Sequence, residues 1–295
     1  MASLKALKVR IGSVKSTQKI TKAMKMVAAA KLRRAQEAAE AGRPYAQRLE
    51  AVVASLASKV TVSESSPRLL AGTGKDQVHL LVVATSDKGL AGAFNTNIAR
   101  LARKHARDLT AAGKTVRIYT IGRKGRAVLN REFRANMVHG IEPGDLGKLT
   151  FADARGYADD IIARYESGEF DVATLFYSNF KSVLTQIPTA SQIVPVSIPE
   201  VAADTQTGVS AATEYEPDEE ELLADLLPRN VAIQLYRAMR ENAASEQGSK
   251  MTAMDNATRN AGDLIKRLSI QYNRARQAAI TTELVEIISG AEALK

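Results

Sequence analysis

The stretch that decides the fold is LKALKVRIGSVKSTQKITKAMKMVAAAKL, residues 4–32. Apolar residues recur in it by alternate steps of three and four, which is the heptad spacing of a helix that packs along another helix. The positions on this seam are Leu4, Leu7, Ile11, Val14, Gln18, Thr21, Lys25, Ala28, Leu32, Ala35, Ala39, Ala46, Leu49, Val53, Leu56 and Val60. The repeat therefore predicts a long coiled-coil helix over residues 1–60.

Two features interrupt this helix. Near the polar seam positions 18, 21 and 25, apolar residues move one stripe over, to Ile20, Met24 and Val27. This shift predicts that the helix offers an apolar face there to something other than its coiled-coil partner. Further on, Gly42-Arg43-Pro44 predicts a bend in the helix or the end of its first section.

The other end of the chain supplies a suitable partner helix. No proline occurs after Pro228, and a second heptad seam is predicted there. Its positions are Met254, Ala257, Ala261, Leu264, Leu268, Gln271, Ala275, Ala278, Thr282 and Val285. One such helix could equally belong to an ordinary bundle, but two at opposite chain ends favour a mutual coiled coil. We expect a C-terminal helical domain over 210–295 that pairs antiparallel with residues 1–60, because the chain between them must return.

The middle of the chain has a different pattern. A continuous apolar run predicts a buried strand at 78–84. Further strands are expected at 116–121, 136–139 and 171–177, and helices at 94–112, from Gly122 and at 150–167. Alternating strands and helices predict a mostly parallel sheet, so residues 75–200 are expected to form an inserted, Rossmann-like α/β domain. The proline-containing segment 186–200 is expected to be an edge strand and exit loop. Residues 61–75 and 201–217 are expected to be connectors. The fold class is thus mixed α and β.

Charge is unevenly distributed along the chain. The net charge is +9, residues 1–36 carry ten Lys or Arg side chains and no carboxylate, and residues 214–225 carry seven carboxylates and no basic side chain. A cationic helix of this kind favours an anionic partner. An acidic protein surface is one candidate, and the alternative is a basic coiled-coil module that binds nucleic acid or an anionic membrane. The basic helix carries no aromatic residue before Tyr45, so it offers nothing for bases to stack on.

No pattern in the chain announces catalysis. The turn Ser86–Asn95 follows the first strand, where phosphate-binding loops occur, but it completes neither G-x-G-x-x-G nor a Walker motif. The chain has no cysteine, and its histidines (His79, His105 and His139) are far apart in sequence. We therefore expect no catalytic residues, no cofactor and no metal site. The chain also lacks an apolar run of the roughly 20 residues that a membrane-spanning helix needs.

Several longer motifs carry a specific resemblance. The sequences concerned are IGSVKSTQKITKAMKMVAA (residues 11–29), SDKGLAG (86–92), MTAMDNA (251–257), NRARQAAITTEL (273–284) and SGA (289–291). In this order, they resemble the signature motifs of the γ subunit of F-type ATP synthases, and the resemblance covers essentially the whole chain. The family often has Cys where this chain has Ala91, and many relatives have an acidic residue where this chain has Lys25.

The resemblance implies a non-catalytic central rotor shaft. In this family, one copy of the paired terminal helices turns inside the α3β3 hexamer, and the α/β domain contacts the ε subunit and the c-ring. Ion-driven rotation of the c-ring is thereby coupled to ATP synthesis or hydrolysis at the β subunits. No nucleic-acid partner is implied.

The resemblance also implies roles for individual residues. The expected contacts to β are Met24, Lys25, Arg276, Gln277, Thr281 and Glu283. Residues expected at the apolar bearing of the shaft tip are Ile287, Ile288 and Leu294, and the central motif contains Asp87, Lys88, Gly89 and Gly92. The start at Met1 without a visible transit segment, and the absence of cysteine, favour a peripheral position on the cytoplasmic face of a bacterial inner membrane.

Overall fold

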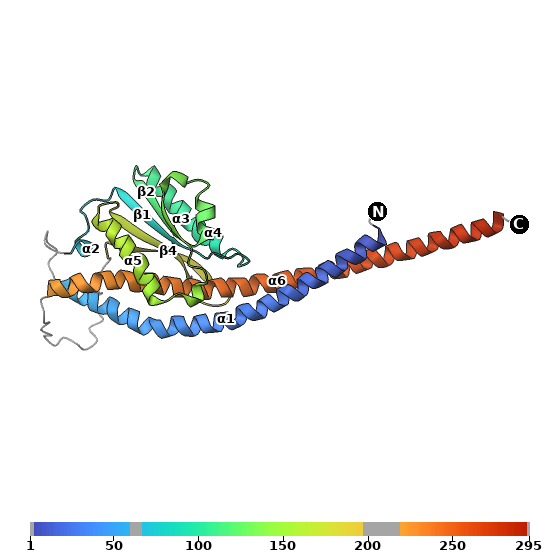
Figure 1. The fold of residues 1–295 in the computed structure, drawn as a ribbon, viewed down its shortest axis with the longest axis horizontal. Coiled ribbons are helices and arrows are strands. Elements are labelled where there is room, and N and C mark those ends of the chain that lie inside the picture. Colours follow the sequence, from blue (N-terminus) through green and yellow to red (C-terminus); the bar gives the residue numbers. More distant parts are fainter. Residues whose placement is uncertain (1–2, 60–66, 197–218, 294–295) are drawn as a thin grey trace. The chain divides into compact units, whose positions relative to one another are not determined.

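A computed structural model describes residues 3–59, 67–196 and 219–293, and these form two compact units. One unit consists of the two chain ends, Met1–Ala29 with Lys250–Lys295, and the other of Ala30–Ser249. Two long helices contribute to both units: α1 covers Leu4–Lys59 and α6 covers Glu219–Ala293. The sheet and the shorter helices belong to the second unit (Figure 1).

The chain-end unit is an antiparallel helix pair. The hydroxyls of Thr21 and Thr258 are 2.8 Å apart, and Lys25 Nζ lies 2.6 Å from Asp255 Oδ1. Rising residue numbers in α1 thus meet falling numbers in α6. The predicted antiparallel coiled coil is confirmed.

The predicted seam of α1 is also confirmed. Its described side chains from Leu4 to Leu56 are all buried or half-buried, whereas Ile20 and Val27 are 59% and 58% exposed. Val60 lies outside the described residues. The prediction that Gly42-Arg43-Pro44 could end the first helical section is wrong, because α1 continues through Pro44. Packing of Ala39 and Val53 on either side supports the helix across the missing backbone hydrogen bond.

The predicted seam of α6 is half wrong. Met254, Ala261 and Leu268 are buried as predicted, but Leu264 and Gln271 are exposed. The half-buried positions are instead one residue further on, at Ile265, Tyr272 and Ala279. The observed steps run four and then three from Met254. The predicted steps run three and then four. Both sequences of steps fit the heptad period, and the position of the partner helix determines which one is buried.

The second unit is built on a five-stranded sheet with the order β3-β2-β1-β4-β5. Strands β1 (Val78–Ala84), β2 (Thr115–Ile121), β3 (Met137–Ile141) and β4 (Val172–Phe180) are parallel. Strand β5 (Gln186–Val194) runs antiparallel to β4 at the edge, as the prolines predicted, since Pro188 cannot donate to a second neighbour.

Helices connect these strands in the predicted order. After α2 (Arg68–Ala71), the chain forms α3 (Phe94–Ala111), α4 (Arg123–Leu129) and α5 (Phe151–Glu166), with short 3₁₀ turns η1 (Arg134–Asn136) and η2 (Leu146–Lys148) on either side of β3. Helix α5 begins with a capping box in which Thr150 and Asp153 exchange hydrogen bonds. Part of the predicted connector 61–75 and all of the connector 201–217 lie outside the described residues.

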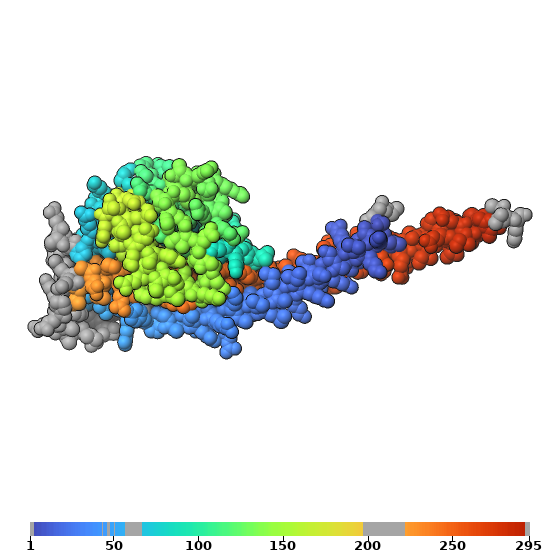
Figure 2. Space-filling view, viewed as in Figure 1, coloured from blue at the N-terminus to red at the C-terminus, as the bar shows by residue number. Residues whose placement is uncertain are grey.

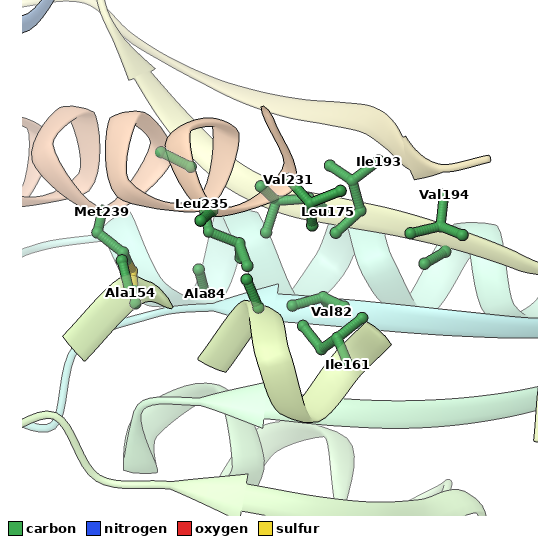
Figure 3. Close-up of a cluster of buried hydrophobic side chains, with 14 of the residues drawn as sticks. Val82, Ala84, Ala154, Ile161, Leu175, Ile193, Val194, Val231, Leu235 and Met239 are labelled. Atoms are coloured by element: carbon green, nitrogen blue, oxygen red, sulfur yellow. The ribbon is translucent and has the colours of Figure 1, made fainter. Parts of the chain in front are cut away.

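Two apolar cores lie on opposite faces of the sheet, because successive β1 side chains alternate between them. Leu81 and Val83 pack with Phe94, Ile98 and other residues of α3. Leu80, Val82 and Ala84 face the other way, toward α5 and α6. Figure 3 shows this second core, where Val231, Leu235 and Met239 of α6 meet side chains from β1, β4, β5 and α5. Together these layers form a compact body in the space-filling view (Figure 2).

Candidate functional site

The central motif, residues 86–92, is a loop that ties three parts of the sheet together. Buried Asp87 accepts hydrogen bonds from the backbone N–H of Arg123 at 2.8 Å and of Gly144 at 2.6 Å. Ser86 donates from Oγ to the carbonyl of Lys88 and exchanges hydrogen bonds with the side chain of Asn95. The carboxylate therefore links the turns after β1, β2 and β3. This arrangement gives Asp87 a structural role.

The tip of this loop projects outward. Leu90 is 62% exposed and has φ of +64°, a conformation that non-glycine residues rarely adopt. Lys88 and Gly92 are exposed, Gly89 is half-buried, and Ala91 is buried. The exposed apolar tip is therefore held in a strained conformation by the buried residues on both sides of it.

The carboxyl edge of the sheet is occupied by the protein itself. In sheets of this topology, ligands bind where the chain leaves neighbouring strands in opposite directions, which here is between β1 and β4. Asn242 of α6 lies at that point. It donates from Nδ2 to the carbonyl of Ala84 at 3.0 Å and accepts at Oδ1 from the N–H of Ser178 at 2.8 Å. Its side-chain amide continues the β1–β4 ladder where the strands diverge.

Three more polar side chains of α6 act in the same way. Glu241 accepts from the N–H of Phe180 at 3.0 Å, Ser245 donates to the carbonyl of Ser178 at 3.0 Å, and Ser249 donates to the carbonyl of Ala91 at 2.8 Å. We call Glu241, Asn242, Ser245 and Ser249 the docking face. It fixes α6 to the sheet both along and around the helix axis.

The docking face was missed by sequence reasoning. Polar residues on a helix usually indicate a solvated face, but the apolar stripe of Leu235, Ala238 and Met239 leads directly into these residues. The signal was their spacing: positions 241, 245 and 249 recur every four residues and so share one side of a helix.

In the chain-end unit, Lys25 has a partner within the chain. Its ammonium group lies 2.6 Å from Asp255, which Arg259 also approaches at 2.9 Å. The hydrogen bond from Lys25 is the main reason that the pKa of Asp255 lies below its usual value. Lys25 and Asp255 thus fix the register of the helix pair. Met24 next to Lys25 is half-buried.

The remaining residues that the resemblance singled out lie in the last part of α6. Arg276, Gln277, Thr281 and Glu283 are exposed, and the Thr281 hydroxyl donates to the carbonyl of Gln277 within the helix. They form one cluster on α6, and Met24 and Lys25 lie on α1 of the same unit.

The end of α6 carries an exposed apolar stripe. Ile280, Leu284, Ile287 and Ile288 are 49–70% exposed and follow helical spacing along one side. Figure 1 shows this last part of α6 continuing past the N-terminal end of α1. The stripe therefore has no covering helix within the described part of its unit, which suits an external apolar partner. Leu294 lies outside the described residues.

The described residues contain neither a candidate metal site nor a candidate membrane-spanning helix. No group of three or more His, Cys, Asp or Glu side chains there could hold a metal ion. Within the same ranges, no helix has the length and apolar character required to span a membrane.

Comparison with known proteins gives a consistent result. A family model described as ATP synthase matches residues 3–294. The ATP synthase gamma chain of Rhizorhabdus wittichii is 70% identical over 294 residues, and that of Ruegeria sp. (strain TM1040) is 60% identical, with 100% of both chains covered in each case.

Solved structures agree with this result. The central stalk and c-ring of the Tetrahymena thermophila mitochondrial ATP synthase matches with a TM-score of 0.60 and 25% identity, covering 81% of this chain and 99% of that chain. A chain of the Euglena gracilis mitochondrial enzyme, in a structure of OSCP, F1 and c-ring, matches with a TM-score of 0.66 and 17% identity, covering 99% and 94%; at that identity, the match shows the fold.

The fold and these matches define a central-stalk subunit of a rotary ATP synthase. The chain belongs to the ATP synthase gamma chain family, and its role is that of the central rotor shaft. The alternative of a basic module for nucleic acid or membrane binding is not supported by these relatives.

Proposed function

We propose that this chain is a non-catalytic rotor, which couples ion-driven turning of a c-ring to ATP synthesis or hydrolysis carried out on β subunits. One copy turns within an α3β3 hexamer, and the α/β domain contacts the ε subunit and the c-ring. The chain takes this position peripherally, on the cytoplasmic face of the bacterial inner membrane.

The observation that carries this proposal is the docking face of α6. A domain that receives torque must not slip on the helix that delivers it. Four polar side chains of α6 hold backbone groups of β1, β4 and the central motif at 2.8–3.0 Å. Hydrogen bonds of fixed direction resist sliding and rotation in a way that apolar contact alone does not.

The occupied carboxyl edge supports the non-catalytic part of the proposal. Asn242 already bonds the backbone groups at the point where nucleotides bind in related topologies. ATP would have to displace α6 to reach this edge. The nucleotide chemistry is therefore assigned to another subunit.

The surface of the chain-end unit suits contacts with β. A rotor can favour different conformations in three identical β subunits only by contacting each of them differently. Exposed basic side chains dominate α1 before residue 29, and Arg276, Gln277, Thr281 and Glu283 are exposed on α6. We assign Met24, Lys25 and these four residues to contacts with β, and the apolar stripe with Ile287 and Ile288 to the bearing at the shaft tip.

The first experiment is isolation of the native complex. The tagged chain is released from washed membranes at low salt, and its partners are identified by mass and by ATPase activity. We expect one copy with three α and three β subunits and high activity, whereas the purified chain alone hydrolyses no ATP. Turnover by the isolated chain at the rate of the complex, or recovery with nucleic acid and without ATPase activity, would contradict the proposal.

Coupling is tested at Met24. A Met24→Lys variant places an additional positive charge on the face assigned to β, and we expect it to impair ATP-driven ion pumping more than complex assembly or ATP hydrolysis. Met24→Gln, similar in size and uncharged, is the matched control and should pump normally. The measurement is pumping into inverted vesicles per ATP hydrolysed, and an unchanged ratio in Met24→Lys would count against the assignment.

A further inference from the structure

The second unit contains a cavity between its two long helices that the rotor function does not use. It has a volume of about 250 Å³ and lies among α1, α6 and the start of α5. Its apolar wall includes Phe151, Ile233 and Tyr236. The rings of Phe151 and Tyr236 pack edge to face, with their centroids 5.8 Å apart. Gly42 and Tyr45 line its α1 side.

Arginines surround the apolar wall. Arg229 lies over the ring of Tyr45 at 5.9 Å, and Arg240 lies over the ring of Tyr236 at 4.9 Å while donating to its hydroxyl. Both arginines line the cavity together with Arg237 and Glu241, and the Glu241 carboxylate accepts a hydrogen bond from the N–H of Phe180. An apolar cavity with a few converging charged groups is the usual form of a small-molecule site.

A second, basic hollow adjoins the first. It has a volume of about 170 Å³ and shares Ala38 and Arg240 with the apolar cavity. Lys31, Arg34 and Lys148 add positive charge to it, and its one carboxylate, Asp145, is paired with Lys31 at 2.7 Å. The two hollows thus offer an apolar compartment and a cationic compartment on either side of Arg240.

We propose that these two hollows form one binding site for a small amphiphilic anion, of the class of medium-chain fatty carboxylates. The hydrocarbon chain occupies the cavity beside Phe151, Ile233 and Tyr236. The carboxylate lies in the basic hollow near Arg34, Lys148 and Arg240. Charge complementarity selects an anion over a neutral amphiphile, and the small volume of the cavity suits a single hydrocarbon chain. Such a ligand would contact α1, α6 and the α/β domain at once.

The structure supplies a blocking variant. Gly42 lines the cavity and a Cβ atom added there meets no atom within 4 Å, so we choose Gly42→Leu as the variant to fill the cavity. Leucine also favours a helix more than glycine does. Gly156 of α5 is equally open and does not line the cavity, so Gly156→Leu is the matched control. Arg34→Gln tests the cationic compartment separately.

The experiment is calorimetric titration of the purified full chain with decanoate below its micelle concentration, and with decanol. We expect one saturable decanoate site, which Gly42→Leu removes and Gly156→Leu keeps. Arg34→Gln should weaken decanoate roughly two- to fivefold, as for an exposed charge pair, and should leave decanol unaffected. Circular dichroism checks that the variants keep their helices.

Three outcomes would overturn the proposal. The first is no saturable decanoate binding by the unaltered chain. The second is decanoate binding that Gly42→Leu leaves unchanged, which would move the ligand to another surface such as the apolar stripe of α6. The third is equal affinity for decanol and decanoate, which would remove the role of the basic hollow.

Discussion

At the scale of single residues, buried or partly buried carboxylates hold the loops of the α/β domain in place. Asp87 is bonded to two backbone N–H groups from different loops, and Asp145 joins η2 to α1 through Lys31. Asp145 also accepts from the N–H of Gly147 at 3.1 Å, so both carboxylates pair with backbone donors of irregular segments. Asp87 is buried and Asp145 is partly exposed, so we expect substitutions at the two positions to have different effects on stability.

Replacing Asp87 by Asn should destabilise the second unit. The substitution keeps the shape of the side chain but turns one acceptor into a donor, which then faces the N–H of Arg123 or of Gly144. We expect a loss of about 1–3 kcal/mol in the free energy of unfolding, measured by urea denaturation of the full chain. Lys88→Gln on the same loop is exposed and should change stability by less than about 0.5 kcal/mol. Equal effects of the two variants would contradict the role given to Asp87.

The ion pair of Asp145 with Lys31 should make the free energy of unfolding depend on pH. The hydrogen bond from Lys31 lowers the pKa of Asp145 below its usual 3.8 in the folded chain. The pair therefore stabilises the fold above pH 3.8, and this contribution is lost as pH falls through the lowered folded pKa. Because both side chains are partly exposed, we expect Asp145→Asn to cost only about 0.5–1 kcal/mol near neutral pH.

Urea denaturation of the unaltered chain and of Asp145→Asn across pH measures this contribution. The difference between the two should be constant near neutrality and should disappear in acid. A difference that grows as pH falls would show that the sign assigned to the pair is wrong.

At the scale of elements, α6 combines the buried apolar stripe of Leu235, Ala238 and Met239 with the docking face. The stripe supplies the burial that stabilises the helix on the sheet, and the docking face determines its position. Polar groups in a buried contact of this kind favour one register over neighbouring ones, because every shifted register leaves backbone groups unpaired.

Asn242→Ala should therefore be more damaging than its small loss of volume suggests. It leaves the carbonyl of Ala84 and the N–H of Ser178 buried without their side-chain partner. We expect a loss of about 2 kcal/mol or more in the free energy of unfolding, from two unsatisfied backbone groups. Asn260→Ala, an exposed position on the same helix, is the control. A loss no greater than that of the control would show that Asn242 does not fix α6 to the sheet.

The elements themselves were largely predictable, because their signals are local. The predicted strand 78–84 matches β1, and Gly122 does precede a short helix. The register of α6 was not predictable beyond Ala261, since neighbouring residues such as Gln271 and Tyr272 both fit a heptad and only the position of α1 decides between them. The docking face depends on backbone groups more than 60 residues away in sequence, such as the N–H of Phe180 for Glu241, and no local pattern records such contacts.

At the scale of the whole molecule, the residues fall into those that hold the fold and those that face partners. The apolar stripe at the end of α6 belongs to the second group, because residues 281–292 are exposed throughout. The sequence could predict this stripe through its resemblance to a family, but not through composition, since exposed isoleucines there look like an ordinary core helix.

Removal of residues 284–295 should separate folding from assembly. We expect the free energy of unfolding of the isolated chain to change by less than about 0.5 kcal/mol, because the described residues removed are exposed. The same truncation should lower the thermal stability of the complex with α and β, where the stripe is assigned to a bearing. A large loss of stability in the isolated chain would instead place this segment within the fold.

The occupation of the carboxyl edge by Asn242 has a consequence for any nucleotide that approaches this sheet. The helix that fills this edge behaves as a tethered ligand, present at a high effective concentration because it is part of the same chain. A free nucleotide would have to compete with it at every moment. The edge at which sheets of this topology bind ligands is thereby a joint in this chain, where backbone groups of β1 and β4 hold α6 through Asn242.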